Sequence, residues 1–493
     1  MKTTSKLAFA FGLTLTATSW SSTLQNEVLS QMRGTRNIIE NHLDQNNCSM
    51  KLSEINKTLE DVNSVNWTVF KNKNNTSNLI KSMFYSRLSL RNKLFSMSSS
   101  RAVDKACENE VRRAIVGFRF LEEYTAKVSG YEDDVEVFQG AEPYLLVNPK
   151  FKEFKLQSGD ILISRGNAIV SAAIAQIGEQ DGHFSHAALV YIDPATNKTY
   201  AIEAHIEIGN DVRPIEDGYL KDGKVRAVVY RQKDPVLAAQ AAKLAFDRIS
   251  AAKNSGERIM YNFAMDLENE AQLFCSQVPY IAYKNGSHGE FVMGKQYQTT
   301  FGMKNKTFLN NIGVTVSHTF APSDVELDSQ LELVAEWRDL GRAHQTHRKD
   351  AVVNRIYEWM EQGTNFDLSK KRMDAALVKF LRDMPLLNNL VKGSVAPNIT
   401  KPALKTMMVL NDVGDKMLDD LIEAYTAKLD KTGIPMNQTE MIQALEEAKK
   451  ADVKRYQVYK SWERQHPSCS GEGDMCLDRP ERPHFIDFFV VAK

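Results

Sequence analysis

The sequence predicts an α+β protein in which a sheet-containing domain lies between two helical regions. In residues 22–145 and 301–493, apolar residues recur mainly every three or four positions, which is the period of an amphipathic helix. In residues 146–300, short stretches alternate between apolar and polar residues, which is the period of a strand with one buried face. We therefore expect a helical N-terminal region, a central domain and a helical C-terminal region with these boundaries.

The overall composition is that of a globular protein with no electrostatic preference for a polyanion. The chain has 493 residues, enough for two or three domains, and 43% of them are hydrophobic. Lys+Arg and Asp+Glu are both 62, so the formal net charge is zero. A balanced charge gives no overall attraction to nucleic acid or to an anionic membrane, and no nucleic-acid partner is expected.

Residues 1–21 have the features of a secretory signal peptide. Lys2 and Lys6 form a basic start, Leu7–Leu15 is apolar, and Ala17–Ser21 offers small residues for cleavage. The apolar run is shorter than the roughly 18 residues that a transmembrane helix needs, and no later stretch reaches that length. We expect an exported protein without a transmembrane segment, located in the periplasm or outside the cell.

The N-terminal region is predicted to be a helical scaffold or lid. Amphipathic stretches are centred on residues 38–43, 79–84 and 111–121, and no group of residues typical of catalysis accompanies them.

Five cysteines in an exported protein suggest disulfide pairing with one residue left over. Cys48 and Cys107 both lie in the N-terminal helical region and are candidates to join two helices. Cys469 and Cys476 flank a short polar loop that a disulfide would close. Other pairings are compatible with the sequence, but this one leaves Cys275 unpaired.

The central domain is predicted to alternate between strands and helices. Strands are expected at 160–164, 186–191, 200–208 and 226–231, and helices at 168–177, at 235–252 and directly after Cys275. The strand at 200–208 alternates most clearly, because Glu203, His205 and Glu207 share one face while apolar residues occupy the other.

Cys275 is expected at the N-terminus of a helix. Pro279 is tolerated only in the first turn of a helix, so the helix must begin within a few residues of Cys275. A helix N-terminus carries partial positive charge and free N–H groups, which lower the pKa of a thiol and can bind an oxyanion. The alternative is a buried cysteine with a structural role.

A histidine and a carboxylate on adjacent strands are candidate partners for this thiol. His186 begins one strand and Glu203 lies on the polar face of the next, about 4.8 Å away. His205 shares that face and is an alternative orienting residue. His183 and His186 suggest a metal site with His205 and Cys275, but no paired-cysteine spacing accompanies them, so no metal site is predicted.

Five short motifs follow one another in the central domain: Gly159–Ile163, Ser185–Val190, Ala201–Ala204, Tyr261 and Phe274–Gln277. In this order they resemble the circularly permuted branch of the NlpC-type papain-like cysteine hydrolases. That branch of the NlpC/p60 superfamily contains YiiX-like and YaeF-like proteins and, more distantly, the vertebrate retinol acyltransferases. The resemblance covers about residues 150–290 and implies a permuted papain-like core with an antiparallel sheet.

The resemblance also implies roles for individual residues. Cys275 would be the nucleophile, His186 the base, Glu203 the residue that orients the imidazole, and Tyr261 a donor to the oxyanion. The family often has Glu two residues after the cysteine, whereas this chain has Gln277. No cofactor is implied.

From residue 330 onward the chain is expected to return to helices. The predicted helices cover 331–340, 352–360, 403–427 and 439–460, and residues 485–491 are expected to form a final strand.

The resulting functional hypothesis is an exported thiol hydrolase with a Cys275, His186 and Glu203 triad. Its expected substrate is an amide bond in a peptide, including cell-wall peptides. The alternatives are an acyl-lipid hydrolase or acyltransferase that uses the same triad, and a binding protein that has kept the fold without catalysis.

Overall fold

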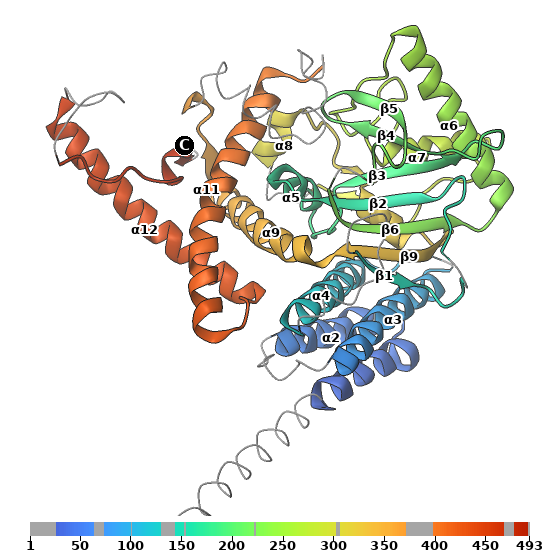
Figure 1. Cartoon of the computed structure of the whole chain (residues 1–493), viewed down its shortest axis with the longest axis horizontal. Helices are drawn as coiled ribbons and strands as arrows, with labels where there is room; N and C mark the ends of the chain where they lie inside the picture. Colours follow the sequence, from blue (N-terminus) through green and yellow to red (C-terminus); the bar gives the residue numbers. More distant parts are fainter. Residues whose placement is uncertain are drawn as a thin grey trace, which may run out of the picture.

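The computed structural model describes residues 26–63, 73–99, 101–129, 143–151, 154–220, 223–301, 306–370, 398–467 and 478–491 (Figure 1). The predicted signal peptide and the predicted Cys469–Cys476 pair lie outside these residues. Within the described part of the chain, no helix is both long and apolar enough to cross a membrane.

A seven-stranded antiparallel sheet forms the centre of the molecule (Figure 1). In sheet order its strands are β1 (Pro143–Val147), β9 (Leu331–Asp339), β6 (Lys224–Gln232), β2 (Ile161–Gly166), β3 (His186–Ile192), β4 (Thr199–His205) and β5 (Gly209–Pro214). The prediction of an α+β protein with an antiparallel sheet is confirmed. Apolar residues are buried on both faces of this sheet.

The N-terminal helices pack beside the β1 and β9 edge of the sheet (Figure 1). They are α2 (Cys48–Asn63), α3 (Lys73–Met97) and α4 (Lys105–Ser129), preceded by a helix over residues 26–37 that continues into the short π-helix η1 (Ile38–His42). Cys48 and Cys107 form a disulfide between α2 and α4, which confirms that predicted pairing.

Buried ion pairs fix these helices against the sheet. Arg87 of α3 contacts Glu122 of α4 and Glu336 of β9, and Arg226 of β6 contacts Glu123 of α4. Removing one partner would leave an uncompensated buried charge, so this network specifies how the helices and the sheet meet.

Helices α5 (Ile169–Ala175), α6 (Pro235–Ser255) and α7 (Gln277–Gly286) complete the central domain. Helix α7 packs against β3 and β4, and α6 packs against β3, β5 and α7. Asp234 caps α6 by accepting hydrogen bonds from the backbone N–H groups of Val236 and Leu237.

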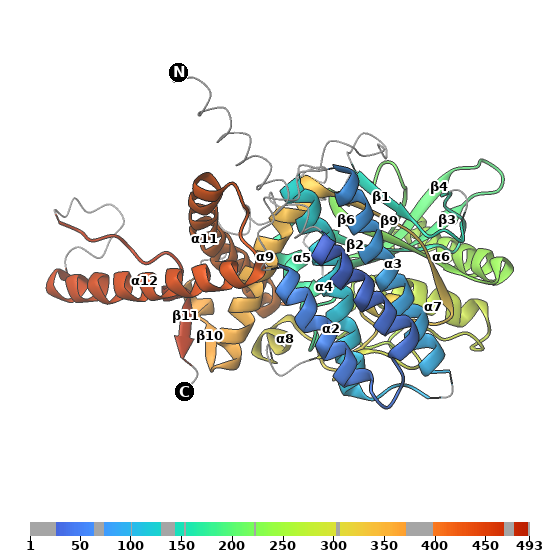
Figure 2. The same cartoon turned by 90° about the horizontal axis from the view of Figure 1, so that it is seen from below.

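The C-terminal helices lie at the other end of the molecule from α6 and α7 (Figure 2). They are α8 (Lys306–Ile312), α9 (Leu340–Glu361), α11 (Lys401–Thr432) and α12 (Gln438–Gln465). Two small two-stranded sheets accompany them: β7 (Thr299–Thr300) with β8 (His318–Thr319), and β10 (Thr364–Phe366) with β11 (Phe489–Val491). The predicted final strand is thus present, but it begins only at Phe489.

The predicted helix at 331–340 is wrong, because these residues form strand β9 and helix α9 begins only at Leu340. The register between β6 and β9 shifts between Val229 and Tyr230, where β9 carries an additional residue. Such a bulge interrupts the two-residue period of a strand. The apolar residues of β9 therefore recur at a spacing that imitates a helix.

The central sheet also contains strands from outside the predicted domain of residues 146–300. Strand β1 begins at Pro143, inside the region predicted to be helical, and β9 comes from the predicted helical C-terminal region. Strand β9 joins β1 to β6, so the sheet combines segments from all three predicted regions.

The predicted strand 200–208 is shorter than expected, and it is followed by a strand that was not predicted. Strand β4 ends at His205, and β5 returns antiparallel from Gly209. Gly209 has φ +78°, and a Cβ there would lie 2.5 Å from the carbonyl oxygen of Ile259. Only glycine fits this turn, which reverses the chain beside β4.

Candidate active site

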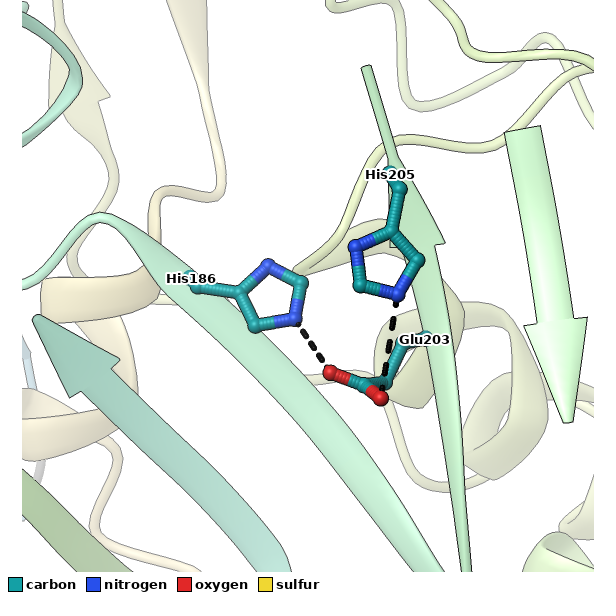
Figure 3. Close-up of side chains that lie close together, drawn as sticks. All are labelled: His186, Glu203 and His205. Carbon is teal, nitrogen blue, oxygen red and sulfur yellow. Dashed lines mark hydrogen bonds and ion pairs between the residues drawn. The ribbon is translucent and has the colours of Figure 1, made fainter. Parts of the chain in front are cut away.

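His186 and Glu203 meet across adjacent strands (Figure 3). His186 begins β3, and Glu203 of β4 pairs directly with Ala188, two residues further along β3. Residues two apart in a strand share a face, so His186 and Glu203 are diagonal neighbours on one side of the sheet. Their Nε2 and Oε2 atoms lie 2.8 Å apart, and the Glu203 side chain is 1% exposed.

Cys275 lies directly before helix α7 and close to the start of β3. Ser276 is the N-cap of α7, and Cys275 is a buried free thiol. The backbone N–H of Ala187, the residue after His186, is near enough to the sulfur to act on the pKa of the thiol. The packing of α7 against β3 therefore brings Cys275 to the strand end that carries His186.

Burial raises the pKa of the Cys275 thiol, which is opposite to the direction expected from a helix N-terminus. The backbone N–H groups of Ala187 and Ser276 do act to lower this pKa, as expected for such a position, but burial outweighs them. The resting thiol is consequently protonated at neutral pH.

The pKa of His186 is lowered to about 4. Burial is the main cause, and the positive charge of Lys224 adds to it, while the hydrogen bond with Glu203 acts in the opposite direction. The imidazole is therefore neutral at physiological pH. The resting site contains a neutral thiol and a neutral imidazole, not a thiolate and an imidazolium.

The ionised state of Glu203 determines which nitrogen of His186 carries the proton. Burial acts to raise the pKa of Glu203, but the neighbouring imidazole of His205 and the hydrogen bond from His186 hold it well below its usual value. An ionised carboxylate only accepts hydrogen bonds, so the Nε2 atom of His186 donates and Nδ1 keeps its lone pair. Among the described residues, this Nδ1 has no hydrogen-bond partner.

Arg213 of β5 also contacts this group, and the sequence analysis did not identify it. Its Nη2 atom lies 3.3 Å from Oε1 of Glu203 and 3.2 Å from Nε2 of His205. Gly209 is the sequence feature that could have revealed Arg213, because the chain reverses there and β5 then pairs with β4.

His205 lies beside His186 but is further from Glu203. The two imidazole rings stack with their centroids 5.3 Å apart, and Nε2 of His205 lies 3.7 Å from Oε1 of Glu203. A distance of 3.7 Å is too long for a hydrogen bond. Glu203 therefore bonds to His186 and Arg213, and His205 bonds to Arg213. The second dashed line in Figure 3 marks the longer contact between His205 and Glu203.

Tyr261 is buried close to Cys275. Burial raises the pKa of its phenol well above the usual value, and the charges of Cys275 and Glu207 act in the same direction. The phenol therefore keeps its O–H proton and can donate a hydrogen bond. The backbone carbonyl of Tyr261 accepts a hydrogen bond of 2.6 Å from the Asn398 side chain, just before α11.

Gln277 holds the loop that precedes Cys275. Its side chain is fully buried, and its Nε2 atom donates to the carbonyl oxygens of Asp266, Leu267 and Asn269 over 3.0–3.2 Å. Its Oε1 atom accepts from the backbone N–H of Phe274. An ionised glutamate at this position could not donate to those carbonyls, so these hydrogen bonds require the amide of Gln277.

Three side chains of the site are of types that bind metal ions. Donor atoms of His186, Glu203 and His205 lie within 4.8 Å of one another. However, the guanidinium of Arg213 already bonds to both Glu203 and His205, so a metal ion here would lie against a fixed positive charge. These residues fit a hydrogen-bonded cluster better than a metal site. His183, considered above as a ligand, is not part of this group.

Comparison of the chain with known protein families, curated proteins and solved structures finds no match.

Proposed function

We propose that this protein is an exported cysteine hydrolase with a permuted, NlpC-type papain-like core, and that it cleaves an amide bond in a peptide, including cell-wall peptides. The observation that carries this proposal is the 2.8 Å hydrogen bond between His186 and Glu203, together with a free cysteine that lies near the backbone N–H of Ala187, the residue after His186. Nucleophilic catalysis by a catalytic triad requires a nucleophile, a base and a residue that orients the base. Export rests on the predicted signal peptide.

In the first half of the reaction, Nδ1 of His186 takes the proton of the Cys275 thiol as the sulfur attacks the substrate carbonyl carbon. The carbonyl oxygen becomes an oxyanion that accepts hydrogen bonds from the backbone N–H of Cys275 and the hydroxyl of Tyr261. The C–N bond then breaks, and His186 returns the proton to the leaving amine.

In the second half, Nδ1 of His186 takes a proton from water as the water oxygen attacks the thioester. The C–S bond breaks, the product acid leaves, and the sulfur regains a proton. Because the resting imidazole is neutral, it is in the form needed to act as a base in both halves.

The same acyl-enzyme would form on a lipid ester, so substrate trials must include both classes. Incubation with peptidoglycan fragments and with phospholipid vesicles, each analysed by mass spectrometry, separates an amidase from an acyl-lipid hydrolase or acyltransferase. We expect free amines and shortened peptides from the first substrate and intact lipids in the second.

The first test of the catalytic proposal uses p-nitrophenyl acetate, a small activated ester that needs no specific pocket. We expect a burst of p-nitrophenol and a mass increase on the peptide that contains Cys275. Cys275→Ala should remove both signals, and His186→Gln should slow the burst by about 100-fold. A thermal midpoint within a few degrees of wild type shows that Cys275→Ala is folded. Equal burst rates in wild type and Cys275→Ala would rule out the proposed nucleophile and favour a binding protein.

A further inference from the structure

Arg213 contacts the proposed triad from the side opposite His186. One guanidinium nitrogen, Nη2, lies within hydrogen-bond distance of both Glu203 Oε1 and His205 Nε2. The Arg213 side chain is 18% exposed and the Glu203 side chain 1% exposed, so the pair is largely shielded from water. Arg213 lies where a second histidine approaches the carboxylate, because Oε2 of Glu203 lies 2.8 Å from His186 and Oε1 lies 3.7 Å from His205.

We infer that Arg213 is a positioning residue that fixes the tautomer of His205 and thereby reserves Glu203 for His186. The inference rests on the proposed function, because it assigns Arg213 a role in the same triad. It also concerns a hydrogen bond that can be measured without any substrate.

A guanidinium donates hydrogen bonds and cannot accept them. The Nε2 atom of His205 must therefore accept from Arg213, and a neutral His205 then carries its proton on Nδ1. In this tautomer His205 has no N–H directed at the Glu203 carboxylate.

Without Arg213, His205 is free to carry its proton on Nε2. That atom lies 3.7 Å from Oε1 of Glu203, so a small movement would complete a hydrogen bond. Oε1 would then accept from His205 while Oε2 accepts from His186, so the carboxylate would have to align with two imidazoles whose rings are stacked on each other. His186 would lose part of the interaction that keeps its Nδ1 unprotonated and in position.

The backbone around Arg213 supports a fixed position for the guanidinium. A Cβ atom at Gly218 would lie 2.9 Å from Nε and 3.0 Å from Cζ of Arg213. Glycine at this position lets the loop after β5 pack directly on the guanidinium. Gly218→Ala therefore displaces the guanidinium without removing its charge, and it serves as a second, independent perturbation.

The direct test is the tautomer of His205 in the wild-type protein. Nitrogen NMR of protein labelled with ¹⁵N-histidine should show a protonated Nδ1 and an unprotonated Nε2, assigned by loss of the signals in His205→Phe. In Arg213→Met we expect the proton of His205 to move to Nε2 or to exchange between the two nitrogens. The two signals should then swap positions or merge. A protonated Nε2 in the wild-type protein would overturn the inference.

The functional test compares acylation of Cys275 by p-nitrophenyl acetate in matched variants. Arg213→Met should slow acylation by about 10-fold, which corresponds to one hydrogen bond to a charged group. Gly218→Ala should also slow it. Arg113→Met, which makes the same substitution at a half-exposed arginine of α4, should leave it unchanged.

The double variant Arg213→Met with His205→Phe separates positioning from general loss of structure. If Arg213 acts by restraining His205, removing the competing imidazole should bring acylation back to within about threefold of wild type, because Glu203 then has no second histidine donor and keeps its hydrogen bond with His186. A double variant as slow as Arg213→Met, or an Arg213→Met variant as fast as wild type, would contradict the inference and leave the proposed function intact. If wild-type acylation does not depend on Cys275, the proposed function fails and the positioning role fails with it.

Discussion

The Nε2 atom of His186 lies 2.8 Å from Oε2 of Glu203, although the two residues are diagonal and not directly opposite in the β3–β4 ladder. The diagonal arrangement lets the imidazole lie along the sheet, with one nitrogen on the carboxylate and the other available to a thiol. In the proposed mechanism, this relationship, more than the pKa of the cysteine, would account for the activation of a buried neutral thiol.

Replacing Glu203 by Gln should slow acylation of Cys275 by about 100-fold while preserving the fold. The amide has the same shape but presents no negative charge, so it neither fixes the Nε2–H tautomer of His186 nor balances Arg213. The measurement is the burst rate with p-nitrophenyl acetate. Glu257→Gln, the same substitution at an exposed position, is the control. A Glu203→Gln variant with the wild-type rate would remove Glu203 from the triad.

The activity of the wild-type protein should fall only when the pH approaches about 4, the lowered pKa of His186, and not near 6.5. The imidazole acts as a base only when it is unprotonated, and burial keeps it so down to that pH. Glu203 raises the pKa of His186, so in Glu203→Gln the residual activity should persist to still lower pH. The check is a pH profile of the burst rate for both proteins. An acidic limb near pH 6.5 would show that His186 titrates as an exposed histidine and would contradict the buried site.

The same pKa shift predicts a pH dependence of stability. The unfolded state binds a proton on His186 below about pH 6.5, whereas the folded state does so only below about pH 4. Folding is therefore favoured by this residue above pH 6.5, and about 3 kcal/mol is lost as the pH falls through that window.

His183 and His344 also have lowered pKa values, so the slope of wild-type stability against pH contains their contributions with the same sign. The difference between wild type and His186→Gln isolates His186. Denaturant unfolding at several pH values should show that the variant loses about 3 kcal/mol less than wild type between pH 6.5 and pH 4. If the unfolding free energies of the two proteins changed in parallel with pH, the lowered pKa of His186 would be refuted.

Local sequence patterns were sufficient to predict that His186 lies beside the strand face that carries Glu203 and His205, and the family resemblance favoured Glu203 as its partner. Both residues lie on consecutive strands joined by a tight turn, so the alternation of each strand and their adjacency in the chain determine which side chains meet. Pro279 located the start of α7 for a similarly local reason, because proline is excluded beyond the first turn of a helix. These predictions needed no knowledge of the rest of the fold.

Features that depend on distant contacts could not be predicted in the same way. Strand β9 is separated from β6 by about 100 residues, and its bulge hides the two-residue period. Arg213 was missed because the reversal at Gly209 depends on close packing against Ile259. The direction of the Cys275 pKa shift was wrong because burial, which comes from tertiary packing, outweighs the effect of the helix N-terminus.

Reducing or removing the disulfide between Cys48 and Cys107 should destabilise the N-terminal helices. The two cysteines are 59 residues apart in sequence, and closing a loop of that length stabilises the folded state by about 4 kcal/mol. The double variant Cys48→Ala with Cys107→Ala should therefore unfold at a lower temperature, while retaining Cys275 acylation at temperatures where it is folded. Peptide mapping under non-reducing conditions checks the pairing first. A Cys48 peptide linked to Cys275 would contradict both the pairing and the free nucleophile.

Gln277→Glu should destabilise the active-site loop. Glutamate keeps an acceptor for the backbone N–H of Phe274 but loses the amide donor, and it places a carboxylate against three backbone carbonyl oxygens. Burying a charge in this environment costs about 3 kcal/mol or more, and the cost is smaller below the pKa of the new carboxyl group, where it is neutral and can donate one hydrogen bond.

The thermal midpoint of Gln277→Glu should therefore lie well below that of wild type at pH 7, with a smaller difference at pH 5. Gln443→Glu, on the exposed face of α12, makes the same chemical change beside Glu447 and should shift the midpoint only slightly. Hydrogen exchange should locate the loss of protection in residues 262–277. Wild-type stability in Gln277→Glu would mean that the loop before Cys275 does not depend on the amide, and that glutamate, the residue common in the resembling family, is equally suitable at this position.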